Sequence, residues 1–423
     1  MGTKRVVAVG VLVLLGVALG GCGESGGDAG SRAYEVDPPA PSNDRLFLGT
    51  DTGLTAMNAD TGEVAFTADG AVPTPDWSTL FRAEPAGDAT RLIAIDPATG
   101  QEVGARDLDP AGLVVRAVGA DPNGGSVALA PPRTGDGTYP AGREQTPIVV
   151  TGLAGDARRY DLPGNYEPEA FSTDLTSLFV IEYTPPEAPD RYRVRRLQLS
   201  SGEVVDVYSV DKELQQAMGG TARTQVLSPD ATRLYTLYTV ESLGSAFVHV
   251  LSLDEQWAHC VDLPLPFGEA PEAATALAVA PDGDRLYVAD RASGAVAEID
   301  THEIAVTRTA DLARDRDDVV AAAAVSDDGT LYVGSGSEVT AIDTDGLEAA
   351  GSWELPGTLS TLELAGDGRR LYLGLGDRIA TVDAATGREL HRVTAPGVTA
   401  ISVVGGLVPP PAVSPPRDYQ CAC

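Results

Sequence analysis

Histidine and cysteine are the residues of this 423-residue chain best suited to metal or nucleophilic chemistry. The four histidines are His249, His259, His302 and His391. His249 and His259 lie in neighbouring predicted strands, and His259 directly precedes Cys260. Adjacent strands could bring these three side chains together, and zinc needs three or four such ligands. Histidines in strands are more often packed side chains than ligands, so we predict no metal site.

Motifs for enzymatic chemistry are absent from the sequence. Its repeats contain no Gly-x-Ser-x-Gly elbow, no His-Glu-x-x-His pair and no phosphate-binding loop. Aspartate-rich segments such as Pro-Asp-Gly-Asp at 281–284 could bind calcium. Each stands where two strands need a tight turn, in which glycine supplies a positive φ and aspartate bonds its own backbone. We therefore predict no catalytic residue and no cofactor.

Those turns belong to a sequence pattern that is repeated eight times: a strand, a tight turn, a strand, and a turn that often ends in Thr-Gly. The clearest copy runs from Ala278 to Asp300. Successive copies of its second strand are 34, 47, 51, 56, 52, 45 and 40 residues apart. Four-stranded propeller blades repeat every 40–50 residues or so. The spacing predicts an all-β fold, a single eight-bladed β-propeller of four-stranded blades; seven blades remain an alternative if the compressed first two units share one.

One strand is left over at the end of the repeats. The segment 398–404 reads Val-Thr-Ala-Ile-Ser-Val-Val, and no inner strand precedes Arg45 in the first unit. We predict that 398–404 pairs into blade 1 and closes the ring, because closure removes exposed sheet edges.

These residues resemble two propeller repeat families. Ala278–Asp300 resembles a YVTN repeat, whereas 45–64 and 380–390 resemble the PQQ-like repeats of quinoprotein-type propellers. The resemblance covers about residues 44–405 and implies the fold more specifically than the function. PQQ-like repeats carry a tryptophan after the Thr-Gly turn that docks neighbouring blades. The residues here are Val64, Val103 and Leu390, so divergent docking is expected.

The same resemblance bears on redox chemistry. Quinoprotein dehydrogenases use a disulfide between adjacent cysteines beside calcium ligands, and this sequence has no adjacent pair. A functional quinone site is therefore not expected.

The amino terminus has the pattern of a secretory leader. Lys4 and Arg5 precede an apolar run of 14 residues, 6–19, which is too short to span a hydrocarbon core of about 30 Å. Leu-Gly-Gly-Cys at 19–22 resembles a bacterial lipobox. We predict a signal peptide over 1–21, lipidation of Cys22, a flexible tether over 22–43 and an extracytoplasmic protein anchored to the cell membrane. A Pro-rich tail, 406–423, is expected to be disordered.

The remaining cysteines suit an oxidising compartment. Cys260 is a candidate disulfide partner of either Cys421 or Cys423, which leaves one thiol over. Cys421 and Cys423 alone supply only two metal ligands, so we predict no metal there.

The net charge of the chain limits the kinds of partner that it can bind. The chain has 30 Lys and Arg against 61 Asp and Glu, a net charge of −31. Such a chain lacks the excess of cations that binds phosphate backbones, so nucleic acid is excluded as a partner. The lipid anchor alone must hold it to the membrane, and we expect a monomer.

Long insertions mark the most informative part of the propeller. Turns between second and third strands, and connections between blades, lie at one end of a propeller, which we call the connection face. Four long segments fall there, over blades 3 to 5: Pro131–Gln145, Pro185–Arg191, Asp211–Gly220 and Pro264–Ala273. They or their flanks carry a candidate binding set: Tyr139, Arg143, Tyr183, Arg191, Tyr192 and Phe267. Neutral drift of the loops is the alternative explanation.

Two functions follow as hypotheses. The first is a non-enzymatic binding or scaffold lipoprotein whose partner is an envelope protein or glycan. The second is a propeller enzyme, either a lactonase-like hydrolase or a degenerate quinoprotein dehydrogenase. An enzyme would need three or more ionisable side chains converging on the mouth of the central channel.

Overall fold

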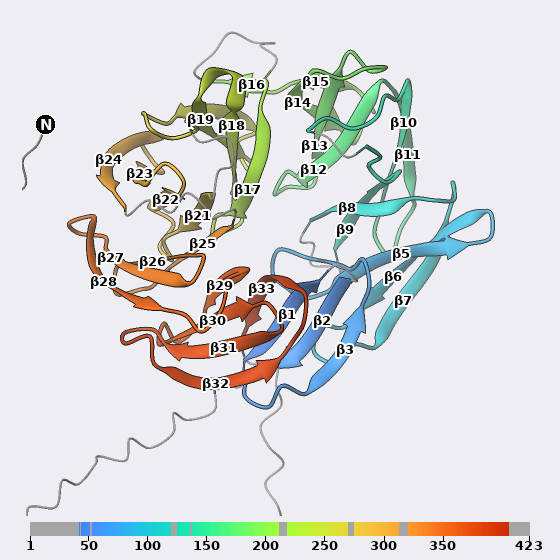
Figure 1. Ribbon diagram of the computed structural model, residues 1–423. Coiled ribbons are helices and arrows are strands. Elements are labelled where there is room, and N and C mark those ends of the chain that lie inside the picture. The colour runs from blue at the N-terminus through green and yellow to red at the C-terminus, as the bar shows by residue number, and fades with distance from the viewer. Residues whose placement is uncertain are drawn as a thin grey trace, which may run out of the picture. The chain divides into compact units, whose positions relative to one another are not determined.

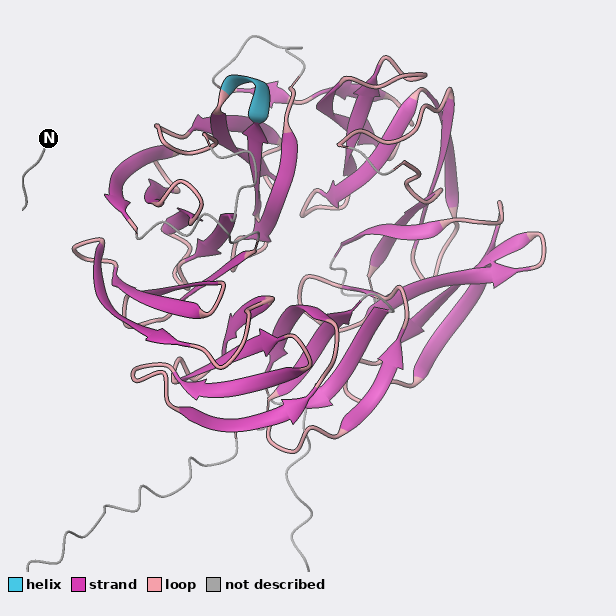
Figure 2. Ribbon diagram, viewed as in Figure 1, coloured by secondary structure: helices cyan, strands magenta, loops and turns pink. Residues whose placement is uncertain are grey.

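The computed structural model describes residues 42, 44–50, 53–119, 125–135, 138–210, 218–269, 275–312 and 320–405. The leader, Cys22, the tether and the tail with Cys421 and Cys423 therefore lie outside the described residues. Within the part that is described, no helix is long and apolar enough to cross a membrane. Figure 2 shows strands almost throughout, with one short 3₁₀ turn, η1 (Glu241–Leu243), in the described chain.

The strands form eight antiparallel sheets that follow one another round a ring (Figure 1). Blades 1 and 2 contain β33 (Val398–Val404), β1 (Arg45–Thr50), β2 (Gly53–Asn58) and β3 (Val64–Ala68), then β4 (Val72–Pro73), β5 (Leu80–Ala86), β6 (Ala89–Ile95) and β7 (Glu102–Leu108). Blades 3 and 4 contain β8 (Val114–Gly119), β9 (Ser126–Ala130), β10 (Gln145–Thr151) and β11 (Arg158–Pro163), then β12 (Asn165–Phe171), β13 (Ser177–Thr184), β14 (Arg191–Gln198) and β15 (Val204–Asp206). Blades 5 and 6 contain β17 (Thr221–Leu227), β18 (Arg233–Val240), β19 (Ser245–Ser252) and β20 (Trp257–Asp262), then β21 (Thr275–Val279), β22 (Arg285–Asp290), β23 (Ala295–Asp300) and β24 (Ala305–Asp311). Blades 7 and 8 contain β25 (Ala321–Val325), β26 (Thr330–Ser335), β27 (Glu338–Asp343) and β28 (Glu348–Glu354), then β29 (Thr361–Leu364), β30 (Arg370–Leu375), β31 (Arg378–Asp383) and β32 (Glu389–Thr394).

The predicted eight blades and the predicted closing strand are both confirmed. β33 pairs antiparallel with all six residues of β1, from Arg45↔Val404 to Thr50↔Val398. Blade 5 gains a fifth strand that was not expected, because β16 (Tyr208–Ser209) pairs parallel with β20.

The core is divided among the spaces between neighbouring blades. Among the described residues, eight hydrophobic clusters each join one blade to the next, so that every such space has one. Leu286 packs in the space toward blade 5, and its neighbour Tyr287 packs in the space toward blade 7. Middle strands are therefore apolar on both faces, which explains the unbroken Leu-Tyr-Val runs.

Blade docking differs from the expectation drawn from the PQQ-like repeats. Val64 and Val103 are 50% and 60% exposed, so neither docks a blade. Docking instead joins the glycine of the Thr-Gly turn to a large side chain of the preceding blade's last strand. The pairs are Gly62 with Val393, Gly100 with Phe66, Gly202 with Tyr160 and Gly387 with Trp353. Phe66 lies two residues after Val64 and beyond a bulge in the β2–β3 pairing, which places it on the face of β3 that meets blade 2.

Candidate functional site

Two of the predicted insertions pack against each other: Pro185–Arg191, which is described in full, and Pro131–Gln145, which is described except for residues 136 and 137. The backbone N–H of Arg143, from the blade 3 insertion, donates to the carbonyl of Pro186 in the blade 4 insertion at 2.8 Å. Beside it the backbone of Gly142 lies so close that a Cβ would stand 2.0 Å from the carbonyl oxygen of Glu187. The Thr138 hydroxyl reaches blade 5, 3.1 Å from that of Thr221. We call this joined surface, residues 131–135, 138–144 and 185–190, the platform.

Hydrogen bonds also fix the platform to the blades beneath it. Asn165, at the start of β12 and 1% exposed, donates from its side-chain amide to the carbonyl of Ala141 at 3.0 Å. The N–H of Gly164 donates to the carbonyl of Glu144 at 2.7 Å. Loops held at several points keep one shape, as a binding surface requires.

The structure divides the six predicted binding residues into two groups. Tyr183, Tyr192 and Phe267 are only 5%, 4% and 1% exposed, so their rings pack inside the fold. Tyr139 and Arg143 are half-buried on the platform, and Arg191 is exposed and pairs with Asp190 at 2.8 Å. The accessible part of the predicted set is therefore Tyr139, Arg143 and Arg191.

A row of aromatic rings supports the platform from below. The ring of Tyr139 lies 6.4 Å from that of Tyr192, which stacks on Tyr238 at 5.4 Å. Tyr238 in turn stacks on Phe247 at 5.2 Å. Tyr238 and Phe247 could not be selected from the sequence, because Tyr238 reaches Tyr192 across the space between blades 5 and 4, and Phe247 joins the row only through Tyr238.

A buried carboxylate beside this row ties three blade segments together. Glu167, on β12, lies 3.5 Å from Arg116 of β8 and 3.6 Å from Arg133 of the platform. It also accepts a 3.0 Å hydrogen bond from the Tyr183 hydroxyl. Burial, and then the charge of Glu167, raise the pKa of Tyr183. The two arginines and the phenol satisfy this carboxylate, so it has a structural role.

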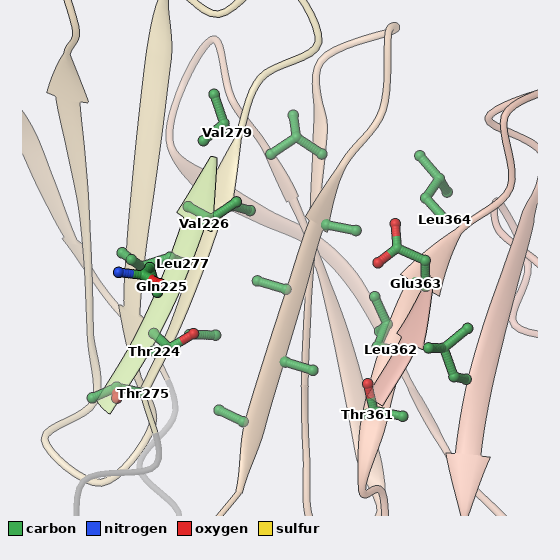
Figure 3. Close-up of a pocket in the computed structure, with 18 of the residues that line it drawn as sticks. Thr224, Gln225, Val226, Thr275, Leu277, Val279, Thr361, Leu362, Glu363 and Leu364 are labelled. Carbon is green, nitrogen blue, oxygen red and sulfur yellow. The ribbon is translucent and has the colours of Figure 1, made fainter. Parts of the chain in front are cut away.

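The central channel contains a cavity of about 810 Å³. Its wall is formed by the first strands of blades 5 to 8 together with β33. Figure 3 shows side chains of β17, β21 and β29 that line it. Alanine, valine, leucine and threonine dominate this wall, and Glu363 is the one ionisable residue among the described residues that line it. The enzyme hypothesis required three or more such groups at the channel, and this cavity supplies one.

Burial changes the acidity of two carboxyl groups on inner strands, Glu363 and Glu169. Burial raises the pKa of Glu363, on β29, to about 7 although a backbone N–H from Leu364 opposes the shift. Burial likewise raises the pKa of Glu169, on β12, to about 7, opposed by a hydrogen bond from Gln225 at 3.4 Å. Each side chain keeps some exposed surface but is otherwise surrounded by protein, which accounts for the shifts.

Replacing Glu363 with glutamine is expected to stabilise the protein at pH 8 by roughly 1–3 kcal/mol. Above pH 4.5 the unfolded carboxyl loses its proton first, whereas the folded one keeps it until about pH 7. The wild-type contribution is therefore fully present below pH 4.5 and is lost as the pH rises through 7. Urea unfolding at pH 5 and pH 8 measures this, with exposed Glu354→Gln as control. An equal gain at both pH values would contradict the assignment.

The candidate metal ligands do not form a zinc site. His249 lies directly opposite Cys260 in the register of β19 and β20, as the sequence suggested. Among the described residues no three His, Cys, Asp or Glu side chains converge. His302 is exposed and contacts Asp284 at 2.9 Å. The predicted pairing of Cys260 with Cys421 or Cys423 stays a prediction, since the tail lies outside the described residues.

Comparison with known proteins gives the fold and no family. No protein-family model and no curated protein matches the sequence. Dihydro-heme d1 dehydrogenase NirN in complex with DHE is similar in structure, with a TM-score of 0.54, 17% identity, and 89% of this chain and 78% of that chain covered. Apo AztD from Citrobacter koseri gives a TM-score of 0.52 at 14% identity, with 86% and 98% covered. A putative 6-phosphogluconolactonase from Bacteroides uniformis gives 0.49 at 15% identity, with 86% and 100% covered. Identities this low show a shared propeller fold alone.

Proposed function

We propose that this protein is a membrane-anchored, extracytoplasmic lipoprotein whose propeller binds an envelope protein through the platform. The supporting observation is that insertions from blades 3 and 4 hydrogen-bond to each other and to the blades below. They build one rigid surface at one end of the scaffold, where binding residues usually gather.

The chemistry of the platform favours a protein partner over a glycan. Its accessible residues combine an aromatic ring, Tyr139, with the guanidinium groups of Arg143 and Arg191, and such residues are enriched in protein interfaces. Acids of the same segments, Glu144, Glu187 and Asp190, give it charges of both signs. A mixed-charge rim around aromatic and arginine anchors suits a folded partner surface.

The platform can be disturbed at one point without touching its exposed side chains. In Gly142→Val the new Cβ alone would lie 2.0 Å from the carbonyl oxygen of Glu187. The branched side chain therefore forces the two insertions apart. Cross-linking in intact cells followed by mass spectrometry is expected to lose the partner captured by wild type, by about tenfold or more.

Gly351→Val is the matched control. A Cβ at Gly351, in the outer strand β28, meets nothing within 4 Å, so valine fits there. Both variants should melt close to wild type, because the platform lies outside the spaces between blades. Undiminished capture by Gly142→Val would refute the platform as the binding surface.

Anchoring has its own test. Cys22→Ser is expected to move the protein from the membrane fraction to the soluble fraction, because acylation contributes about 0.8 kcal/mol per buried CH₂ and the acidic propeller adds no attraction to anionic lipid. Fractionation and immunoblotting measure the shift, with Cys260→Ser as control. Retention of Cys22→Ser in membranes would show that another element holds the protein there.

A further inference from the structure

Two sulfur atoms from distant parts of the chain meet between blades 4 and 5. The thiol sulfur of Cys260, on β20, lies 4.0 Å from the thioether sulfur of Met218. Met218 is held by two backbone hydrogen bonds with Tyr192, at 3.0 and 2.7 Å. The backbone of the sheet therefore fixes both members of the pair.

An imidazole lies on the same face of the sheet. His249 is directly opposite Cys260 in the β19–β20 register, where paired side chains have Cβ atoms about 4.5–5.5 Å apart. His249 is 2% exposed, and its ring meets Tyr238 edge-on with centroids 6.5 Å apart. A thiol, a thioether and an imidazole thus gather in one interblade space.

The spacing of the sulfurs suits a shared metal ion. At a metal–sulfur distance of about 2.3 Å, two sulfurs arranged trigonally around one ion lie about 4 Å apart. Ordinary core packing also brings sulfurs to this separation, because Met and Cys fill cores as hydrophobic residues. The imidazole beside the pair, and the partial exposure of Cys260 that gives an ion access, favour the metal.

The donor set selects the metal. Thiolate and thioether are soft ligands that prefer Cu(I), whereas Cu(II) prefers nitrogen and oxygen in a square arrangement. Zinc lacks its usual ligands, because no three His, Cys, Asp or Glu converge in the described chain. The aromatic rings of Tyr192 and Tyr238, each 4% exposed, exclude water from one side of the site. A dry environment favours Cu(I), which carries a lower charge than Cu(II).

The phenol of Tyr192 is buried near the pair. Burial is the main cause that raises the pKa of this phenol, followed by Tyr238, with Tyr139 and the Cys260 thiol contributing. The hydroxyl therefore lies close enough to Cys260 to sense its charge.

We propose that Cys260 keeps its thiol rather than pairing with Cys421 or Cys423, and that Cys260, Met218 and His249 form a binding site for one Cu(I) ion. The ion enters as Cu(I), the Cys260 thiol releases its proton to solvent as the copper–sulfur bond forms, and no electron is transferred. This inference is independent of the proposed binding of an envelope protein, and either can fail without the other.

The test is an anaerobic titration of the full chain with Cu(I) in competition with the chromogenic chelator bicinchoninate. One ion per chain is expected at this site. Cys260→Ser and Met218→Leu are each expected to weaken it by more than about 100-fold, and His249→Gln by at least tenfold. His302→Gln, at an exposed histidine outside the site, should bind as wild type.

Two controls separate the site from other thiols and from misfolding. Cys421 and Cys423 could bind copper themselves, so the titration is repeated in Cys421→Ser/Cys423→Ser, which should keep the blade site. Melting curves check each variant, and Cu(I) should raise the melting temperature of wild type but not of Met218→Leu. Loss of copper only with the tail cysteines, full affinity in Met218→Leu, or a disulfide at Cys260 would each overturn the proposal.

Discussion

Truncation after Pro396 is expected to lower the melting temperature by about 10 °C or more. The deletion removes β33, which pairs with every residue of β1. It also removes the buried side chains of Val398 and Ile401, 3% and 5% exposed, each worth about 1.5–3 kcal/mol. The newly unpaired β1 would present an open sheet edge, so aggregation should accompany the loss of stability.

The matched control is truncation after Gly405, which removes the Pro-rich tail and keeps β33. Calorimetry of the two truncated proteins separates the strand from the tail. The shorter deletion should melt as wild type. An unchanged melting temperature after the longer deletion would show that β33 does not hold the ring closed.

The fold could be predicted because every blade repeats the same local pattern of buried strands and turn residues. Every second strand must be apolar on both faces, as Leu286 and Tyr287 show by packing toward opposite neighbours. Turn glycines and aspartates at fixed offsets then mark where strands end. The closing strand could be predicted for a related reason, because a first unit that begins at Arg45 lacks an inner strand.

The site could be predicted only in outline. Its position followed from the length of the insertions, but the burial of Tyr183 and Tyr192 depends on contacts between residues far apart in sequence. Tyr139 reaches Tyr192 from another blade, and no local period encodes that approach. Glu363 carries a signal in the sequence, because it is a carboxylate within an otherwise apolar or hydroxyl-bearing inner strand, Thr-Leu-Glu-Leu.

The docking of blades shows how a family pattern can mislead by two residues. The position chosen beside the Thr-Gly turn, Val64, points to solvent, whereas Phe66 on the same strand covers Gly100 of the next blade. A bulge in the β2–β3 pairing puts Val64 opposite Met57 and Phe66 opposite Ala56, so the two side chains lie on opposite faces of β3 and only Phe66 faces blade 2. The glycine is the constant partner, and the large residue varies among Phe, Tyr, Trp and Val.

If the turn glycines dock the blades, adding a single methyl group at Gly387 should greatly reduce the free energy of unfolding. Its φ of 68° is in the left-handed region, and a Cβ there would lie 2.3 Å from the ring of Trp353. Gly387→Ala is therefore expected to cost about 1 kcal/mol for the backbone conformation and about 1–3 kcal/mol more for overpacking between blades 7 and 8. The free energy of unfolding in urea measures the sum.

Gly376→Ala isolates the docking contribution, because Gly376 has the same φ of 68° and a Cβ there meets nothing within 4 Å. Gly376→Ala should lose only the stability that the left-handed backbone conformation costs an alanine. Trp353→Leu in the Gly387→Ala background should recover part of the lost stability, since the smaller side chain leaves room for the methyl group. Equal losses in the two alanine variants would mean that the turn glycines are selected for their backbone conformation and that blade docking depends on other contacts.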